Sequence, residues 1–427
     1  MSEKIILGDR AIYSSDCAQT GINNNVMLCG FSGSGKTMSI CEPRLLETTE
    51  SSLVVTVTKR RLVNTYRRLF EERGYKVIDL NFIDPERSDV RFDPLDYMMS
   101  DEDIEYFATS LIVGDGQKNP YSQADPYWAQ AAASLFSAEI AHVCRLHPGA
   151  GLDEVLQFHS RIHLDYSRDL VQTSVDKEFR EILEIAPDSF EARCWSTFVS
   201  TPIRTAGCIF SDLNSKIDRL FPSSMREMLR KKERLDIAEM GWKKTVLFVS
   251  TSSTNKGLQN YLNIFYGQVF RTLFHFADTC GSGRLPIGVH MICDDFASGG
   301  CIENFPEMIS VFREKNISVT LLLQSESQLN KMYGREDATT IINNCNTYVY
   351  LGGMDLQTAK NVSIRANLPL EDVLSMPVGK EIIFRVGSRP LLTQRYPVLD
   401  HPVYQKVQKA FEEEARQQKS FYERLIH

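Results

Sequence analysis

The sequence predicts an α/β protein: a mostly parallel sheet with helices on both faces and an all-helical domain inserted into it. Three observations support this prediction. A glycine-rich loop at residues 30–37 lies between an apolar strand and a helix, and apolar β-branched runs alternate with helical patterns around it. From about residue 101 to 240 the patterns are helical, without a convincing strand. Strands that alternate with helices imply a mostly parallel sheet.

The expected elements follow in chain order. Short strands are predicted at 5–9 and 11–13, and a strand at 25–29 leads into the loop. After the loop we expect a helix at 38–41 that breaks at Pro43, then a strand at 52–57, a helix at 62–74 that stops at its glycine, and a strand at 76–80. Helical patterns within the insertion include 128–146 and 190–220. Strands return at 244–249, 289–293, 318–323, 347–351 and 381–386.

These elements divide the 427 residues into four parts. A nucleotide-binding domain is expected in two pieces, 1–100 and 241–403, separated by the helical insertion 101–240 and followed by a polar helix or tail at 404–427. The composition is that of a soluble globular protein, 43% hydrophobic and 24% charged. Its net charge of −7 does not itself indicate nucleic-acid binding, although a local basic surface could still bind DNA.

Cysteine spacing and hydropathy bear on the compartment. The ten cysteines are scattered singly, without a Cys-x-x-Cys pair, which argues against a zinc site or a disulfide framework and favours a reducing cytoplasm. No apolar run approaches the roughly 18 residues that span a bilayer, and the first residues lack a signal-peptide pattern. The chain as given is therefore expected to be soluble and cytoplasmic.

The loop Gly-Phe-Ser-Gly-Ser-Gly-Lys-Thr has the parts that a phosphate-binding P-loop needs. Small residues let backbone N–H groups surround phosphate oxygens, the lysine reaches the β- and γ-phosphates, and the hydroxyl holds Mg²⁺. The residues expected to bind the nucleotide are Gly30, Ser32, Gly33, Ser34, Gly35, Lys36, Thr37 and Met38. A glycine-rich turn that matches by chance is the alternative, and the strand before it and the helix after it argue against that alternative.

Two further strand ends supply polar groups. Asp294 and Asp295 follow a buried strand, as expected for a carboxylate that holds Mg²⁺ with Thr37 and a second that orients the attacking water. Adjacent acids can also mark a strand that turns into solvent, a reading that the P-loop makes weaker. Gln324 ends the next strand, where an amide can sense the γ-phosphate or only cap the strand.

Several arginines and basic runs keep two interpretations. Arg313, Arg335 and Arg365 are candidates for an arginine that a neighbouring subunit inserts into the site, and nothing in the sequence selects one. The runs at 59–61 and 230–234 either face a phosphate backbone or form solvated surfaces.

Taken together, these motifs resemble the TraG-like coupling proteins of conjugation and type IV secretion. The resemblance extends from about residue 7 to 401. It rests on the segments 23–28, 73–77, 93–96, 125–128, 294–297, 305–309, 317–319, 323–329, 341–345 and 350–353.

The resemblance implies a RecA-like domain that uses ATP and Mg²⁺, and hexamers around DNA at the cytoplasmic face of a membrane channel. A relaxase-bound DNA strand, expected to be single-stranded, would be delivered to that channel, and the isolated chain could be monomeric.

Three departures from the family pattern matter. The family normally begins with transmembrane helices, and none is predicted here, so we expect either a soluble branch or a chain whose anchor lies on another polypeptide or was removed. Such a chain would reach the membrane only through partners. Residues 57–61 keep only the lysine of the usual Asp-Pro-Lys-Gly-Glu, and Asp295 stands where Glu is commoner, so hydrolysis is expected to be slow or partner-dependent.

The leading hypothesis is therefore an ATP-dependent coupling protein that recruits a relaxase–DNA substrate and drives it to the secretion channel, with the helical insertion as cargo reader. Two alternatives stay open. One is a nucleotide-gated adaptor that hydrolyses ATP poorly, which the altered 57–61 stretch favours. The other is a soluble DNA-stimulated ATPase that works outside transfer.

Overall fold

The computed structural model describes residues 3–58, 60–113, 126–167, 169–252, 256–294, 296, 301–302 and 304–413. The chain forms two compact units. The first comprises residues 1–79, 236–253 and 270–427, and the second comprises 80–235 and 254–269. The boundaries expected from the sequence, at 100/101 and 240/241, remain predictions.

The larger sheet has the strand order β11-β10-β9-β3-β8-β7-β4-β6-β5, counted over the described residues. Adjacent strands from β9 to β6 pair in parallel, whereas β10 and β11 are antiparallel at one edge. This confirms the predicted mostly parallel sheet. The strands are β3 (Val26–Cys29), β4 (Ser52–Val57), β5 (Lys76–Asn81), β6 (Thr245–Ser250), β7 (Val289–Cys293), β8 (Ile317–Leu323), β9 (Thr347–Tyr350), β10 (Lys380–Arg385) and β11 (Leu391–Gln394).

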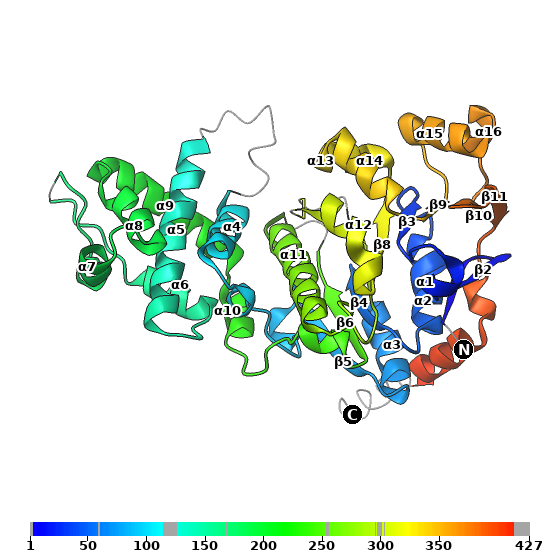
Figure 1. The fold of residues 1–427 in the computed structure, drawn as a ribbon, viewed down its shortest axis with the longest axis horizontal. Coiled ribbons are helices and arrows are strands. Elements are labelled where there is room, and N and C mark those ends of the chain that lie inside the picture. The colour runs from blue at the N-terminus through cyan, green and yellow to red at the C-terminus, as the bar shows by residue number, and fades with distance from the viewer. Residues whose placement is uncertain are drawn as a thin grey trace, which may run out of the picture. The chain divides into compact units, whose positions relative to one another are not determined.

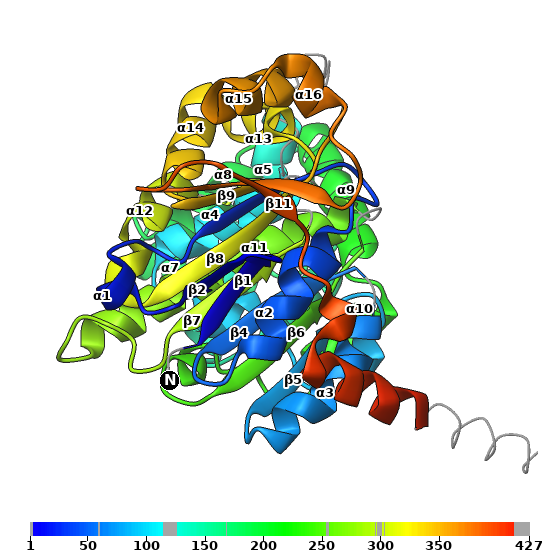
Figure 2. The same cartoon turned by 90° about the vertical axis from the view of Figure 1, so that its right-hand side faces the viewer.

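Helices cover both faces of this sheet (Figure 1). On one face lie α2, α3 and a helix over residues 402–413, which Figure 2 shows from that side. These helices bury apolar side chains against the strands. On the other face, α12 packs against β8. A separate antiparallel hairpin, β1 (Lys4–Gly8) and β2 (Ala11–Ser14), packs near α2. The helices of this unit are α1 (Cys17–Thr20), α2 (Glu42–Glu47), α3 (Arg61–Glu72), α12 (Phe305–Lys315), α13 (Glu326–Tyr333), α14 (Arg335–Asn343), α15 (Leu356–Ala366) and α16 (Leu370–Leu374).

The second unit is helical. Its helices are α4 (Asp101–Ile112), α5 (Pro126–Leu146), α6 (Leu152–Ser160), α7 (Asp176–Ile185), α8 (Phe190–Val199), α9 (Ile203–Leu220) and α10 (Ser223–Leu229). Aromatic side chains fill its interior, and the rings of Phe179 and Trp195 stack with centroids 3.8 Å apart. The long helix α11 (Lys256–Thr279) contributes its first part, residues 256–269, to this unit and the remainder to the first unit.

Two of the predicted helices were wrong in detail. The chain does not break at Pro43: a π-type turn over Thr37–Cys41 continues into α2, and Pro43 lies in the first turn of that helix, where no N–H donor is required. The helical pattern at 190–220 is not continuous, because Pro202 separates α8 from α9 and serves as the N-cap of α9. The short edge strand β11 was not predicted.

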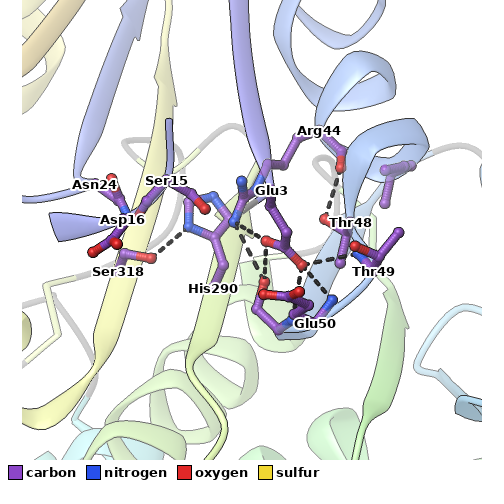
Figure 3. A network of polar contacts seen from close by, with 12 residues as sticks. Glu3, Ser15, Asp16, Asn24, Arg44, Thr48, Thr49, Glu50, His290 and Ser318 are labelled. Atoms are coloured by element: carbon purple, nitrogen blue, oxygen red, sulfur yellow. Dashed lines mark hydrogen bonds and ion pairs between the residues drawn. The ribbon is translucent and has the colours of Figure 1, made fainter. Parts of the chain in front are cut away.

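A buried polar network lies at the amino ends of the parallel strands (Figure 3). The carboxylate of Glu3 accepts hydrogen bonds from the backbone N–H groups of residues 49–51, at 2.6 to 2.8 Å, and from Arg44 Nη2 at 3.2 Å. His290 lies between the hydroxyls of Ser318 and Thr320, at 2.7 and 2.9 Å, and burial lowers its pKa well below the usual range. The network thus joins the first residues of the described chain to α2.

No helix in the described part of the chain is both long and apolar enough to cross a membrane.

Candidate nucleotide-binding site

The glycine-rich loop leaves the sheet at the end of β3, between two neighbouring strands. The N–H of Gly30 donates to Leu323 O at 3.1 Å, at the end of β8, and the N–H of Phe31 donates to Gly352 O at 3.1 Å, just after β9. The N–H of Ser39 donates to Gly35 O at 2.9 Å and begins the π-type turn. The loop is therefore held by backbone hydrogen bonds at both ends.

Three glycines are required by this conformation. A Cβ at Gly30 would lie 2.7 Å from Ser34 Oγ and 2.9 Å from Leu351 Cβ, so any side chain would displace its neighbours. Gly33 and Gly35 have φ angles of +80° and +81°, which L-residues adopt only with strain. The loop can therefore fold tightly only with glycine at these positions.

Lys36 and Ser34 turn polar groups into the loop. The Lys36 side chain is 9% exposed, and its Nζ donates to Gly30 O at 2.7 Å and to Phe31 O at 3.3 Å. The buried Ser34 Oγ has no hydrogen-bond partner among the described residues. A buried cation and an unsatisfied hydroxyl inside a glycine loop fit an anionic group such as a phosphate. Ser32 and Met38 are exposed, and Thr37 is partly buried.

The carboxyl ends of β8 and β7 bring Gln324 and Asp294 to the same edge of the sheet as the loop. Because β3, β8 and β7 are parallel neighbours in that order, their polar ends follow one another along this edge. Gln324 is exposed, and its N–H donates to Gln328 Oε1 at 3.2 Å. Asp295 lies outside the described residues, so its predicted place at this edge remains a prediction.

Thr56 positions Asp294, and sequence reasoning missed this residue. Its hydroxyl donates to Ile292 O at 2.8 Å and accepts the backbone N–H of Asp294 at 3.1 Å. Thr56 is 2% exposed and lies near the end of β4, beside β7. A threonine inside an otherwise apolar buried strand was the available signal.

The donors at this edge suit Mg²⁺ rather than a protein-enclosed metal. Among the described residues no three His, Cys, Asp or Glu side chains are grouped so as to hold a metal. Mg²⁺ at nucleotide sites takes one or two protein oxygens and completes its shell with phosphate oxygens and water. The hydroxyl of Thr37 and the carboxylate of Asp294 are oxygen donors of that kind.

Two buried thiols lie beside the loop. Burial raises the pKa of Cys29 to about 12 and the pKa of Cys41 well above its usual value. These raised pKa values disfavour a thiolate nucleophile beside the loop at neutral pH.

Several basic residues have partners within the chain. Arg60 makes a two-pronged ion pair with the buried Asp79, at 2.6 and 3.3 Å, and also donates to Ser250 Oγ at 3.3 Å. Arg61 donates to the hydroxyl of Tyr404 at 3.1 Å. In the second basic run, Arg230 pairs with Asp153 at 2.8 Å. These contacts favour a structural role for both runs, and Lys59 lies outside the described residues.

The three candidate arginines lie apart from the loop. Arg313 lines a cavity of about 340 Å³ at the amino ends of the strands and donates to Cys17 O at 3.1 Å. Arg335 and Arg365 line a cavity of about 400 Å³ between α13, α14 and α15, where Arg365 pairs with the buried Glu326 at 2.7 Å. None of these contacts selects an arginine that would act on a neighbouring subunit.

Comparisons with known proteins point in one direction. The family described as Type IV secretory system Conjugative DNA transfer matches residues 3–366. The conjugal transfer protein TraG of Rhizobium radiobacter is 22% identical over 414 residues, which cover 87% of this chain and 61% of TraG. The chain thus spans about three fifths of the length of this curated relative.

Two kinds of solved structure share the fold. The plasmid coupling protein TrwB, in complex with a non-hydrolysable ATP analogue, aligns with a TM-score of 0.62 and 14% identity over 87% of this chain and 85% of that one. VirB4 of Thermoanaerobacter pseudethanolicus aligns with a TM-score of 0.53 and 13% identity over 95% and 98%. Since the family match covers most of the chain and agrees with the predicted resemblance, the protein belongs to the type IV secretory system conjugative DNA transfer family of TraG- and TrwB-like coupling proteins.

Proposed function

We propose that this chain is an ATP-dependent coupling protein that recruits a relaxase–DNA substrate and drives it towards a type IV secretion channel. The observation that supports it best is the glycine loop with a buried Lys36, set at the same sheet edge as Asp294 and Gln324. In a member of a conjugative DNA transfer family, a phosphate-binding loop of this kind favours nucleotide-driven transfer.

Each residue at this edge has a proposed role. The backbone N–H groups of residues 32, 33 and 35–38 would hold the phosphates, because those of residues 30, 31 and 34 donate within the chain. Lys36 would neutralise phosphate charge. Thr37 and Asp294 would hold Mg²⁺, which supplies positive charge to the phosphate oxygens when it is bound. Asp295 would orient the attacking water and Gln324 would sense the γ-phosphate. TrwB has been solved with an ATP analogue and with ADP and Mg²⁺, which supports the same ligands here.

Assembly and location are further parts of the proposal. We expect a hexamer around DNA, with single-stranded DNA as the transferred form and the isolated chain able to remain monomeric. The protein would act at the inner face of the membrane through channel components. The presence of relaxase and channel genes beside this gene would support transfer, whereas their absence would favour a DNA-stimulated ATPase in another process.

Steady-state ATP hydrolysis by the purified chain tests the proposal. Turnover is measured with and without single- and double-stranded DNA, in the wild type, Lys36→Ala and Asp295→Asn. Lys360→Ala, an exposed lysine on α15, is the matched control. DNA is expected to raise a rate that the first two variants lower about a hundredfold or more and the control leaves unchanged. A rate that Lys36→Ala does not lower would contradict the proposal.

A nucleotide-gated adaptor is the second candidate, and the contacts of Arg60 favour it. The resemblance implies a polar network after β4, near the phosphates. In this chain Arg60, which follows β4, instead donates hydrogen bonds to Asp79 and Ser250. ATP binding without turnover above the Lys36→Ala background, with or without DNA, would make this adaptor the better account. If the shorter side chain at 295 limits turnover, Asp295→Glu is expected to raise it about tenfold or more.

A further inference from the structure

Arg395 reaches the outer side of the glycine loop from a strand that the sequence analysis did not predict. It directly follows β11, and its backbone N–H donates to Gly379 O at 2.9 Å, which anchors it to the residue before β10. Its guanidinium Nη1 donates to Ser34 O, and Nη2 donates to Leu351 O at 3.2 Å. One side chain of the edge hairpin therefore bridges the loop and the end of β9.

The carbonyl that Arg395 holds belongs to a critical peptide. Ser34 O and the N–H of Gly35 are parts of the same peptide unit, and no cis peptide occurs in the described residues. In a trans peptide these two groups point in opposite directions. Fixing Ser34 O outwards, towards Arg395, therefore turns the Gly35 N–H towards the inner side of the loop.

This peptide needs an external support. It lies between Gly33 and Gly35, whose positive φ angles leave the backbone unusually free to rotate. Arg395 Nη1 lies only 3.2 Å from where a Cβ of Gly35 would be, so the guanidinium packs directly against the peptide. A guanidinium has a planar fork of donors, which suits two carbonyls better than the single ammonium group of lysine does.

We propose that Arg395 is a positioning residue that fixes the Ser34–Gly35 peptide with its N–H facing the bound phosphates. The proposal rests on the nucleotide site described above. A donor oriented in advance does not have to lose conformational entropy when the ligand binds, so Arg395 would contribute to nucleotide affinity without contacting the nucleotide.

The same hairpin offers a matched control. Arg385, the last residue of β10, places its guanidinium 3.8 Å from the ring centroid of Tyr13. Arg385→Gln therefore removes a half-buried arginine from this hairpin while leaving the contacts of Arg395 in place. A general weakening of the hairpin should affect both variants alike.

The first measurement is hydrogen exchange of the ligand-free protein, read by mass spectrometry on peptides that cover residues 28–38. Arg395→Gln is expected to speed exchange in this segment about tenfold, with Arg385→Gln like the wild type and Arg395→Lys between them. This readout does not depend on nucleotide binding. Equal exchange in Arg395→Gln and the wild type would overturn the proposed positioning, even if the protein binds nucleotide normally.

The second measurement is the Kd for ADP with Mg²⁺, by titration calorimetry. Losing hydrogen bonds from a charged donor is expected to raise the Kd about tenfold in Arg395→Gln, and about threefold in Arg395→Lys. An equal rise in Arg385→Gln would overturn the inference. If Arg395→Gln does not fold, Arg395→Lys replaces it. A Kd in Arg395→Lys equal to that of the wild type would then overturn the inference. A wild type that binds no ADP overturns the proposed function, and this inference with it.

Discussion

A buried carboxylate beside Arg395 should make stability fall as pH rises. Glu381, on β10, is 0% exposed, and neither of its carboxylate oxygens has a hydrogen-bond partner among the described residues. Burial raises the pKa of Glu381 to about 8 from its ordinary value of 4.5, although the nearby Arg395 acts against this rise. Glycine at position 8 is what leaves room for it, because a Cβ there would lie 2.3 Å from Oε1.

The sign and size follow from linkage. Between pH 4.5 and about 8 the folded chain keeps a proton that the unfolded chain releases, so the free energy of unfolding decreases over this window. Each pKa unit corresponds to about 1.36 kcal/mol, so the full cost is on the order of 5 kcal/mol, of which about 4 kcal/mol develops above pH 5. Glu381→Gln removes the titrating group and should remove this pH dependence.

Urea unfolding at steps between pH 5 and pH 9 tests this prediction. The difference in unfolding free energy between Glu381→Gln and the wild type should grow with pH in favour of the variant, by a few kcal/mol. Glu371→Gln, which changes an exposed glutamate on α16, is the control and should stay parallel to the wild type. A difference between Glu381→Gln and the wild type that does not change with pH would refute the reasoning.

Three further predictions concern buried polar contacts of the first unit. Thr56→Val should lower kcat for ATP about tenfold, whereas Thr56→Ser should not, because only a hydroxyl can accept the N–H of Asp294; equal kcat values would count against this role. Arg60→Gln should lower the free energy of unfolding by about 2 kcal/mol in urea, since it removes the ion pair between Arg60 and the buried Asp79 while Arg60 itself is partly exposed. Burial acts to raise the pKa of Glu3, but Arg44 and the donors of residues 49–51 hold it below 4.5, so its contribution to stability is present above pH 4.5 and is lost as the pH falls further. Glu3→Gln should therefore lower the melting temperature at pH 7 and converge on the wild type in acid, and parallel curves would contradict this.

Local sequence patterns were sufficient to predict most of the sheet. Strands such as Ser52–Val57 and Val289–Cys293 are fully buried and consist largely of apolar residues, which is the pattern of strands buried on both faces. The glycine loop was also predictable from a local pattern, because its residues are contiguous in the sequence. Strand β11 was missed because it is a short edge strand whose side chains are partly exposed, so it lacks a buried apolar run.

The supporting residues of the site could not be predicted from local patterns. Arg395 lies 361 positions from Ser34 in the chain, and only the pairing of β10 with β9 brings it to the loop. Thr56 and Asp294 are separated by 238 positions and meet because β4 and β7 are neighbours in the sheet. Such contacts depend on strand order, and a single sequence does not reveal strand order.

The contacts of Arg60 give a physical meaning to the altered stretch after β4. A guanidinium held at 2.6 Å by the buried carboxylate of Asp79 has its charge compensated within the chain, so it is poorly suited to bind a phosphate. Charge compensation at the phosphates would then depend on Lys36, and the orientation of the loop would depend on Arg395. Changes at Arg60 should accordingly alter stability more than catalysis, whereas changes at Arg395 should alter nucleotide affinity first. A loss of stability without a loss of catalysis on changing Arg60 would show that the altered stretch after β4 supports the structure and does not act on the nucleotide.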